Sequence, residues 1–168
     1  PDRTTARPLE ASSSKFAAIP NANELAWYVM KGDPRYDADE LWSTMGYLYK
    51  GGMWFKKKAN IAGFSDSHHP DNASTDLRDT STRVAKAASQ QLPVITEMNQ
   101  YFYLPFLGYY STGSNNYKFQ AAGLTGYYWT SSAVPSNQTG SYALTINKGL
   151  AALQEASPSN GLIVRPFE

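Results

Sequence analysis

Two adjacent histidines are the residues of this chain best suited to metal chemistry. His68 and His69 lie between Asp66 and Asp71, and imidazole together with carboxylate is a ligand set that zinc and other divalent ions accept. The chain has no other histidine, so a site would need carboxylates from distant segments to complete it. A solvated polar loop explains the run more simply, and we predict neither a metal ion nor a cofactor.

A second group of chemically capable residues comprises the acids between Asp33 and Glu40. Asp37, followed three residues later by Glu40, resembles a helix capping box, so we interpret these acids as caps rather than as acid–base catalysts. The sequence has no Gly-x-Ser-x-Gly motif, no P-loop, no dinucleotide-binding motif and no cysteine. We therefore predict that the chain is not an enzyme.

The composition excludes two classes of partner. The net charge is +1, and the only dense basic run is Lys56-Lys57-Lys58, which is too short to follow a phosphate backbone. No stretch approaches the 18 apolar residues of a membrane span. Aromatic residues make up 14% of the chain and charged residues only 17%. Few charges and many tyrosines favour a recognition surface for a protein or a glycan.

The elements that must position such a surface divide the chain into two parts. Residues 1–20 are rich in Ser, Thr, Ala and Pro and are expected to form a linker or a lead-in strand. Residues 21–168 suit one domain with its own core. Because the first residue is Pro rather than Met, we expect the C-terminal part of a longer protein or a processed chain.

Helices are predicted first and strands afterwards. The pattern predicts a helix over 21–31, capped by Asn21 or Asn23, and a second over 38–50, where apolar residues repeat at helical spacing. Residues 63–82 are expected to form a long polar surface loop, and residues 83–91 are weakly helical. From Tyr101 onward, strands are predicted over 101–110, 126–132, 141–146, 150–154 and 162–167, separated by turn residues such as Asn147-Lys148-Gly149. This order predicts an α+β domain.

Motifs spread along most of the chain, about residues 21–168, resemble a known family. They are Asn23-Glu24-Leu25-Ala26-Trp27-Tyr28, Gly51-Gly52-Met53-Trp54-Phe55, Phe102-Tyr103-Leu104-Pro105, Leu107-Gly108-Tyr109-Tyr110, Gly126-Tyr127-Tyr128-Trp129-Thr130-Ser131-Ser132, Tyr142-Ala143-Leu144, Asn160-Gly161 and Val164-Arg165-Pro166-Phe167. The set is similar to bacterial C-type-lectin-like domains of Bacteroidetes surface and fimbrial-tip proteins, including variable proteins diversified by retroelements.

The resemblance implies a fold and a function. The fold would be C-type-lectin-like, with two helices packed on a small twisted antiparallel sheet and long loops. The function would be non-enzymatic ligand binding, as an adhesin or receptor-binding domain outside the cytoplasm, on a bacterial cell surface, a pilus tip or a phage particle. The carboxylate-containing triplets by which animal C-type lectins bind calcium do not occur here, so no calcium-dependent sugar site is expected.

The resemblance also implies a variable ligand-binding face formed by loops near the C-terminus. Its candidate residues are Gln120, Val134, Ser136, Asn137, Gln138, Lys148, Leu150, Ala152, Leu153, Gln154, Glu155, Ser157 and Ser159. The stretch 150–156 is more apolar than the comparable positions of the family. An alternative function is a structural pilus or fimbrial subunit that assembles with its neighbours through residues 1–20 or through exposed strand edges.

Overall fold

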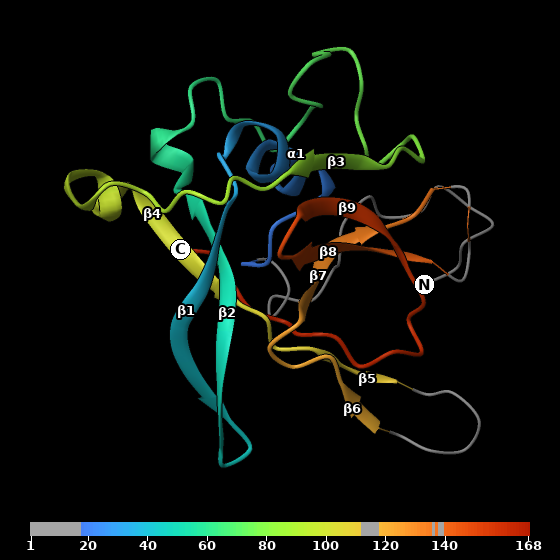
Figure 1. Cartoon of the computed structure of the whole chain (residues 1–168). Coiled ribbons are helices and arrows are strands. Elements are labelled where there is room, and N and C mark those ends of the chain that lie inside the picture. Colours follow the sequence, from blue (N-terminus) through green and yellow to red (C-terminus); the bar gives the residue numbers. More distant parts are fainter. Residues whose placement is uncertain (1–17, 112–117, 136, 138–139) are drawn as a thin grey trace.

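The computed structural model describes residues 18–111, 118–135, 137 and 140–168. Figure 1 shows its elements in chain order. They are α1 (Ala22–Lys31), β1 (Arg35–Thr44), β2 (Tyr47–Lys56), the 3-10 helix η1 (Lys58–Asn60), β3 (Val84–Ala87), the 3-10 helix η2 (Ile95–Gln100), β4 (Tyr101–Pro105), β5 (Tyr109–Ser111), β6 (Lys118–Gln120), β7 (Thr125–Ala133), β8 (Ser141–Asn147) and β9 (Leu150–Ala156).

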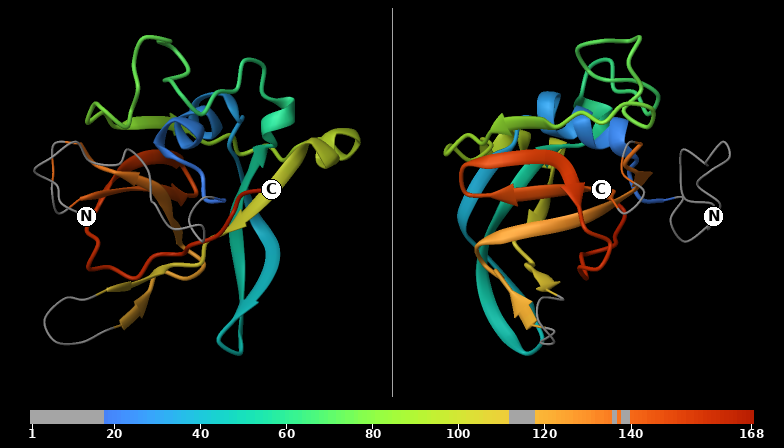
Figure 2. Two further views of the ribbon diagram at one scale, coloured as in Figure 1. Left: turned by 180° about the vertical axis from the view of Figure 1, so that it is seen from behind. Right: turned by 90° about the vertical axis from the view of Figure 1, so that its right-hand side faces the viewer.

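The predicted α+β fold with two helices packed on one sheet is wrong. The described residues contain one α-helix, and most of their regular structure is strand. The strands form a three-stranded sheet of order β1-β2-β4, a four-stranded sheet of order β3-β9-β8-β7 and the small β5-β6 hairpin. Every pairing within these sheets is antiparallel. Figure 2 shows the two larger sheets beside each other, with α1 across one end.

The first predicted helix is confirmed, and its cap shows why it forms. The Asn21 side chain accepts a hydrogen bond from the Glu24 amide at 3.0 Å, and the Glu24 carboxylate accepts from the Asn21 amide at 2.8 Å. This capping box satisfies two amides that the first turn leaves without helical partners. The other proposed cap, Asn23, is buried and bonds elsewhere.

The second predicted helix, over 38–50, is wrong because these residues form most of the β1–β2 hairpin. Its cross-strand pairs include Trp42 with Tyr49 and Thr44 with Tyr47. Aromatic and β-branched residues prefer a pleated strand, and the expected helical stripe arises here from chance spacing of apolar residues. Residues 83–91 are likewise not helical, since they contain β3, which pairs with β9.

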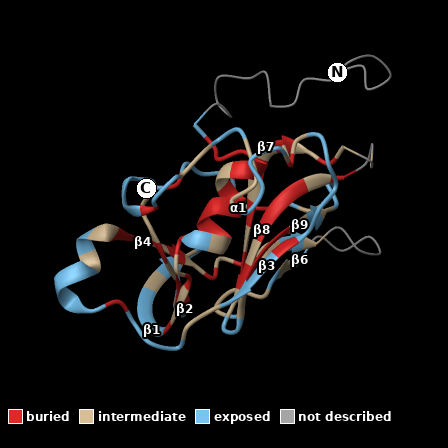
Figure 3. Cartoon of the chain, turned by 90° about the horizontal axis from the view of Figure 1, so that it is seen from above, coloured by how far each residue is buried: buried red, intermediate tan, exposed pale blue. Residues whose placement is uncertain are grey.

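The core lies between the two larger sheets and α1, as the buried segments of Figure 3 show. Tyr28 of α1 packs edge-on against Phe102 of β4 at 5.3 Å between ring centroids, and Tyr128 of β7 packs edge-on against Phe167 at 5.9 Å. The predicted C-terminal strand, 162–167, is instead an extended segment. It makes an isolated bridge to β7, in which the Ile163 amide donates to the Tyr127 carbonyl at 3.1 Å.

The long polar loop of residues 63–82 is anchored to α1 from within the core. Asn23 is fully buried, and its amide group donates to the Asp76 carboxylate at 2.8 Å and to the Asp66 carbonyl at 3.2 Å. Its carbonyl oxygen accepts from the Leu77 amide at 2.9 Å. A single buried side chain thus satisfies three groups of the loop, which a solvated loop would leave to water.

Candidate functional site

We call the distal half of the β1–β2 hairpin, residues 41–49, the arm. It extends past the end of β4, whose last residue, Pro105, pairs with Gly52, and Figures 1 and 2 show its turn projecting from the body of the molecule. None of its nine residues is charged. Its exposed large apolar side chains are Leu41 (61% exposed), Met45 (62%), Tyr47 (68%) and Leu48 (69%).

The turn at the end of the arm places a bulky residue in a left-handed conformation. Met45 has φ 52° and Gly46 has φ 80°. Two consecutive positive φ angles define the type I′ turn of a two-residue hairpin, which favours Asn or Asp followed by Gly. A side chain such as Met costs about 1–2 kcal/mol in this region. Met45 is therefore a poor choice for the turn and, being exposed, adds little to the core.

The two faces of the arm differ in their contacts. On one face Trp42 and Tyr49 stack with 5.0 Å between ring centroids, and the Trp42 indole donates to the Gly51 carbonyl at 2.8 Å. The Tyr110 hydroxyl of β5 reaches the Met45 sulfur at 3.3 Å, which braces the arm from that side. The other face carries Leu41 and Leu48, which are diagonal neighbours across the strands and remain exposed.

A bulge separates the arm from the base of β1. Between Asp37, which pairs with Gly52, and Leu41, which pairs with Lys50, the register shifts by two residues. The Asp37 carboxylate stabilises this bulge, since one oxygen accepts from the Asp39 and Glu40 amides at 3.0 Å each. The predicted helix capping box is therefore wrong: the Glu40 amide does donate to Asp37, but within a bulge of β1 rather than at the start of a helix.

The outer edge of β1 is covered only at its first residues. The Tyr36 amide donates to the Ser89 carbonyl at 2.8 Å, and the Ser89 amide donates to the Pro34 carbonyl at 2.9 Å. Beyond this point the segment around Ser89 leaves the strand. Within the described ranges, no backbone segment is hydrogen-bonded to the outer edge of residues 37–44.

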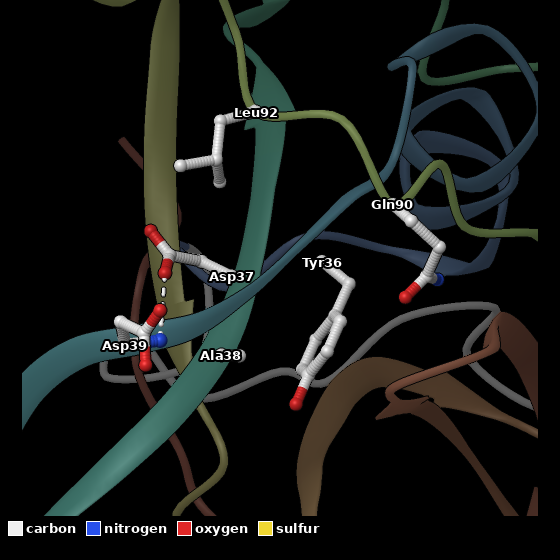
Figure 4. A pocket seen from close by; sticks show the side chains of 6 residues that line it. All are labelled: Tyr36, Asp37, Ala38, Asp39, Gln90 and Leu92. Carbon is white, nitrogen blue, oxygen red and sulfur yellow. Dashed lines mark hydrogen bonds between the residues drawn. The ribbon is translucent and has the colours of Figure 1, made fainter.

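A pocket of about 260 Å³ lies where the covering segment leaves β1. Its lining residues are Tyr36, Asp37, Ala38, Asp39, Gln90 and Leu92, shown in Figure 4. Asp37 is buried and also accepts from the Trp54 indole at 2.9 Å. The Asp39 side chain is 89% exposed, and its one ion pair is with Lys50 at 3.4 Å. The pocket therefore presents carboxylate oxygens and an amide group at the edge of the sheet.

Tyr103 lies beside this pocket on the outer face of the sheet. Its ring packs against Trp54 at 5.0 Å and covers Gly52, where a Cβ atom would come within 2.3 Å of the Tyr103 ring. Its hydroxyl is buried and has no hydrogen-bond partner within the described part of the chain. Burial, together with the nearby Asp37 and Glu40 carboxylates, raises the pKa of Tyr103, so the phenol is neutral at physiological pH.

The residues predicted for the variable face do not form one surface. Val134, Ala152 and Leu153 are buried in the core, and Ser136 and Gln138 lie outside the described residues. Lys148 is exposed and Leu150 half-buried, both at the β8–β9 turn. At the opposite end of this hairpin the Asn137 amide donates to the Glu155 carboxylate.

The remaining predicted residues are more accessible. The hydroxyls of Ser157 and Ser159 lie 2.8 Å apart, and Gln154 donates to Thr145 at 3.0 Å. Gln120 is exposed on β6. The neighbouring Phe119 packs on Tyr110 at 5.3 Å, and Tyr110 in turn contacts Met45 of the arm.

His68 connects the 63–82 loop to α1, whereas His69 bonds within the loop. The Trp27 indole donates to the His68 carbonyl at 2.9 Å, and the Asp71 amide donates to the His69 ring at 3.1 Å. In the ranges that the structure describes, no three His, Asp or Glu side chains are grouped as a metal ion would require.

Sequence reasoning missed the arm because its apolar residues also fit a helix. The signal that could have revealed it is Met45-Gly46 between Trp42 and the Tyr47–Tyr49 segment, since aromatic pairs on either side of a Gly-containing dipeptide indicate a hairpin.

Comparison with known proteins shows which family the chain belongs to. No curated protein and no solved structure is significantly similar to this chain. No helix in the described ranges is long and apolar enough to cross a membrane. A domain of unknown function, DUF8237, matches residues 82–167, a segment that runs from just before β3 to the C-terminal segment and excludes the arm. The chain therefore belongs to the DUF8237 family.

Proposed function

We propose that this chain is a non-enzymatic binding domain that recognises a macromolecular ligand through the exposed face of the arm. The observation that carries the proposal is an uncharged hairpin tip that displays Leu41, Met45, Tyr47 and Leu48 to solvent. Leu41 and Leu48 are neighbours on one face of the arm, and exposed apolar side chains gathered in this way characterise interaction sites.

The arm contributes little to folding, which supports a role in recognition. Leu41 and Leu48 are more than 60% exposed, so their burial in this chain stabilises the fold weakly. Met45 holds a left-handed backbone conformation that Asn or Gly would adopt with less strain. Strain and exposed apolar area that do not serve the core are typical of functional sites.

Bracing by β5 supports the same role. Tyr110 contacts Met45, and the Trp42–Tyr49 stack stiffens the two strands, so the arm has a defined shape before a ligand binds. A surface that is ordered in advance loses less conformational entropy on binding.

The resemblance to retroelement-diversified proteins adds a second part to the proposal. The exposed positions among the predicted face residues, such as Gln120, Lys148 and Ser157, would vary between relatives and tune ligand choice. The resemblance also supports a location on a bacterial surface, a pilus tip or a phage particle. Sequencing this coding region across a natural population tests the first point, and a flat distribution of substitutions along the chain would contradict it.

The test of the arm uses two defined probes, a glycan array and a phage-displayed library of random dodecapeptides. The variant Leu41→Ser/Leu48→Ser removes the exposed apolar pair, and Ile95→Ser is the matched control. Ile95 is 89% exposed and lies on η2, which leads into β4 at the end of the hairpin far from the tip.

The ligands that these probes yield should bind the parent chain and the Ile95→Ser control equally. They should bind Leu41→Ser/Leu48→Ser at least about tenfold more weakly, because two apolar contacts are lost. Circular dichroism should show that all three chains are equally folded. Ligands that bind all three chains with one affinity would refute the arm as the binding surface.

A structural subunit is a second candidate, favoured by the uncovered outer edge of β1 at 37–44, since free strand edges pair between subunits. Sedimentation of the purified chain distinguishes the two. Concentration-dependent assembly without any ligand supports the subunit, and a monomer at all concentrations supports the binding domain.

A further inference from the structure

We propose that the partner is an extended polypeptide strand of another protein, which adds to the outer edge of β1 at the arm and places a Lys or Arg side chain in the acidic pocket at its base. This inference rests on the proposed function and names the chemistry of the ligand.

The edge of β1 is protected in one half and open in the other. Over 37–40 the bulge and the exposed acids Asp39 and Glu40 discourage pairing, which is how natural sheets protect their edges. Over 41–44 the strand is regular, uncharged and paired only on its inner side. In an antiparallel ladder alternate residues direct their amide and carbonyl groups outward, so this segment can form a new ladder.

The exposed side chains continue this edge into an apolar face. Leu41 and Leu48 lie on the same side of the hairpin. A strand added beside β1 would direct every second side chain to that side, so that one of them packs across Leu41. Backbone hydrogen bonds would supply affinity, and the leucine pair would select apolar residues at alternate positions.

The pocket supplies the charge selection. It is adjacent to the open edge, two to four residues before Leu41, and its wall holds the Asp37 and Asp39 carboxylates with the Gln90 amide. Asp37 is buried, and among the described residues it accepts hydrogen bonds from one indole and two backbone amides and pairs with no cation. In the part of the chain that the structure describes, the Asp39 carboxylate has one ion pair, the long contact with Lys50, which solvent weakens. A basic side chain from the partner fits both acids.

Two other occupants fit less well. A lipid bilayer cannot satisfy the outward amide and carbonyl groups of an open strand edge. A second copy of the arm could pair with the edge, but residues 41–49 carry no cation for the pocket. A foreign strand with one basic residue satisfies both the edge and the pocket.

The experiment uses peptides enriched from the random dodecapeptide library on the whole chain, synthesised with fluorescein and measured by fluorescence anisotropy. We expect alternating apolar residues with one Lys or Arg a few positions away. Replacing that residue by Gln should weaken binding about tenfold, since a charge-assisted contact is lost. N-methylation should abolish binding at alternate peptide positions and be tolerated at the intervening ones.

Asp39→Asn tests the pocket from the side of the protein, with Asp79→Asn as the control. Both acids are exposed, and both substitutions change the net charge equally. We expect Asp39→Asn to weaken binding about threefold at low salt, less at high salt, and Asp79→Asn to leave it unchanged.

The outcomes separate this inference from the function on which it rests. Some peptides could depend on Leu41 and Leu48 yet tolerate N-methylation at every position, or need no basic residue. Either result would overturn the added strand with its basic side chain and leave the arm as the binding surface. A second result would also overturn the added strand: no peptide is enriched, while glycans or phosphatidylcholine vesicles bind through the arm. Self-association lost in Leu41→Ser/Leu48→Ser would mean that the edge pairs with a second copy. Ligands indifferent to the double variant refute the proposed function itself.

Discussion

Replacing Met45 by Asn should make the protein more stable and a poorer binder. Met45 has φ 52° at the first position of the arm's turn, followed by Gly46 at φ 80°. Asn tolerates the left-handed region far better than Met, which pays about 1–2 kcal/mol there. The substitution therefore removes strain without changing the turn type.

The expected magnitude follows from what Met45 contributes in return. The side chain is 62% exposed, so its removal loses little burial, and its polar contact with the Tyr110 hydroxyl is a weak bond to sulfur. Relief of the left-handed strain, less the small loss of burial and of the sulfur contact, should give a net gain of about 0.5–1 kcal/mol in the free energy of unfolding. For a domain of this length each kcal/mol raises Tm by about 2–4 °C.

Urea denaturation and differential scanning calorimetry of three chains measure this effect. Met45→Ala is the control, because Ala keeps the strained φ but loses the side chain, and it should not be stabilised. Met45→Asn should weaken binding of the arm's ligands relative to the parent chain. An Asn variant no more stable than the Ala variant would refute the claim that the turn is strained.

Three further substitutions or conditions test the fold that supports the arm. Asn23→Ala should lower the free energy of unfolding by about 2–4 kcal/mol, because it leaves several buried groups of the 63–82 loop without partners. Urea denaturation measures this loss, and a loss below about 1 kcal/mol would contradict the anchoring role of Asn23. Burial alone would raise the pKa of Asp76, yet hydrogen bonds from a neighbouring arginine and from Asn23 lower it from 3.8 to about 2. Folding therefore favours the charged form of Asp76, so about 2 kcal/mol of stability that is present above pH 4 should be lost as pH falls toward 2. Urea denaturation of the parent and Asp76→Asn chains over a pH series checks this. An equal dependence of the free energy of unfolding on pH in both chains would contradict it. Gly52→Ala should destabilise by about 1–3 kcal/mol because its Cβ would lie 2.3 Å from the Tyr103 ring, whereas Gly149→Ala, with its nearest neighbour at 3.8 Å, should be nearly neutral in thermal melts.

Some features of this protein follow from local sequence alone. Asn21 and Glu24 form a capping box, and Gly32 ends the helix that follows, because a cap needs only residues within one turn of each other. The strands β7, β8 and β9 and the turn at 147–149 were likewise predicted within a few residues, since alternation and turn chemistry are local too. Asp37 does accept backbone amides a few residues ahead, but within a bulge of β1 rather than at the start of a helix.

Long-range pairing decided the rest. Leu41, Met45 and Leu48 fit a helix by spacing, and only the cross-strand pairs with β2 and the bracing by Tyr110 make them a projecting arm. Local periodicity cannot distinguish the two structures, because the energy that separates them comes from contacts with residues distant in sequence. The same reason explains the candidate variable face: apolar Ala152 and Leu153 lie in the core because β9 runs through the middle of its sheet, with β3 and β8 on either side. The acidic pocket, too, forms where residues 88–92 leave β1 beside the bulge. These two segments are about 50 residues apart in the chain, so only tertiary packing brings them together.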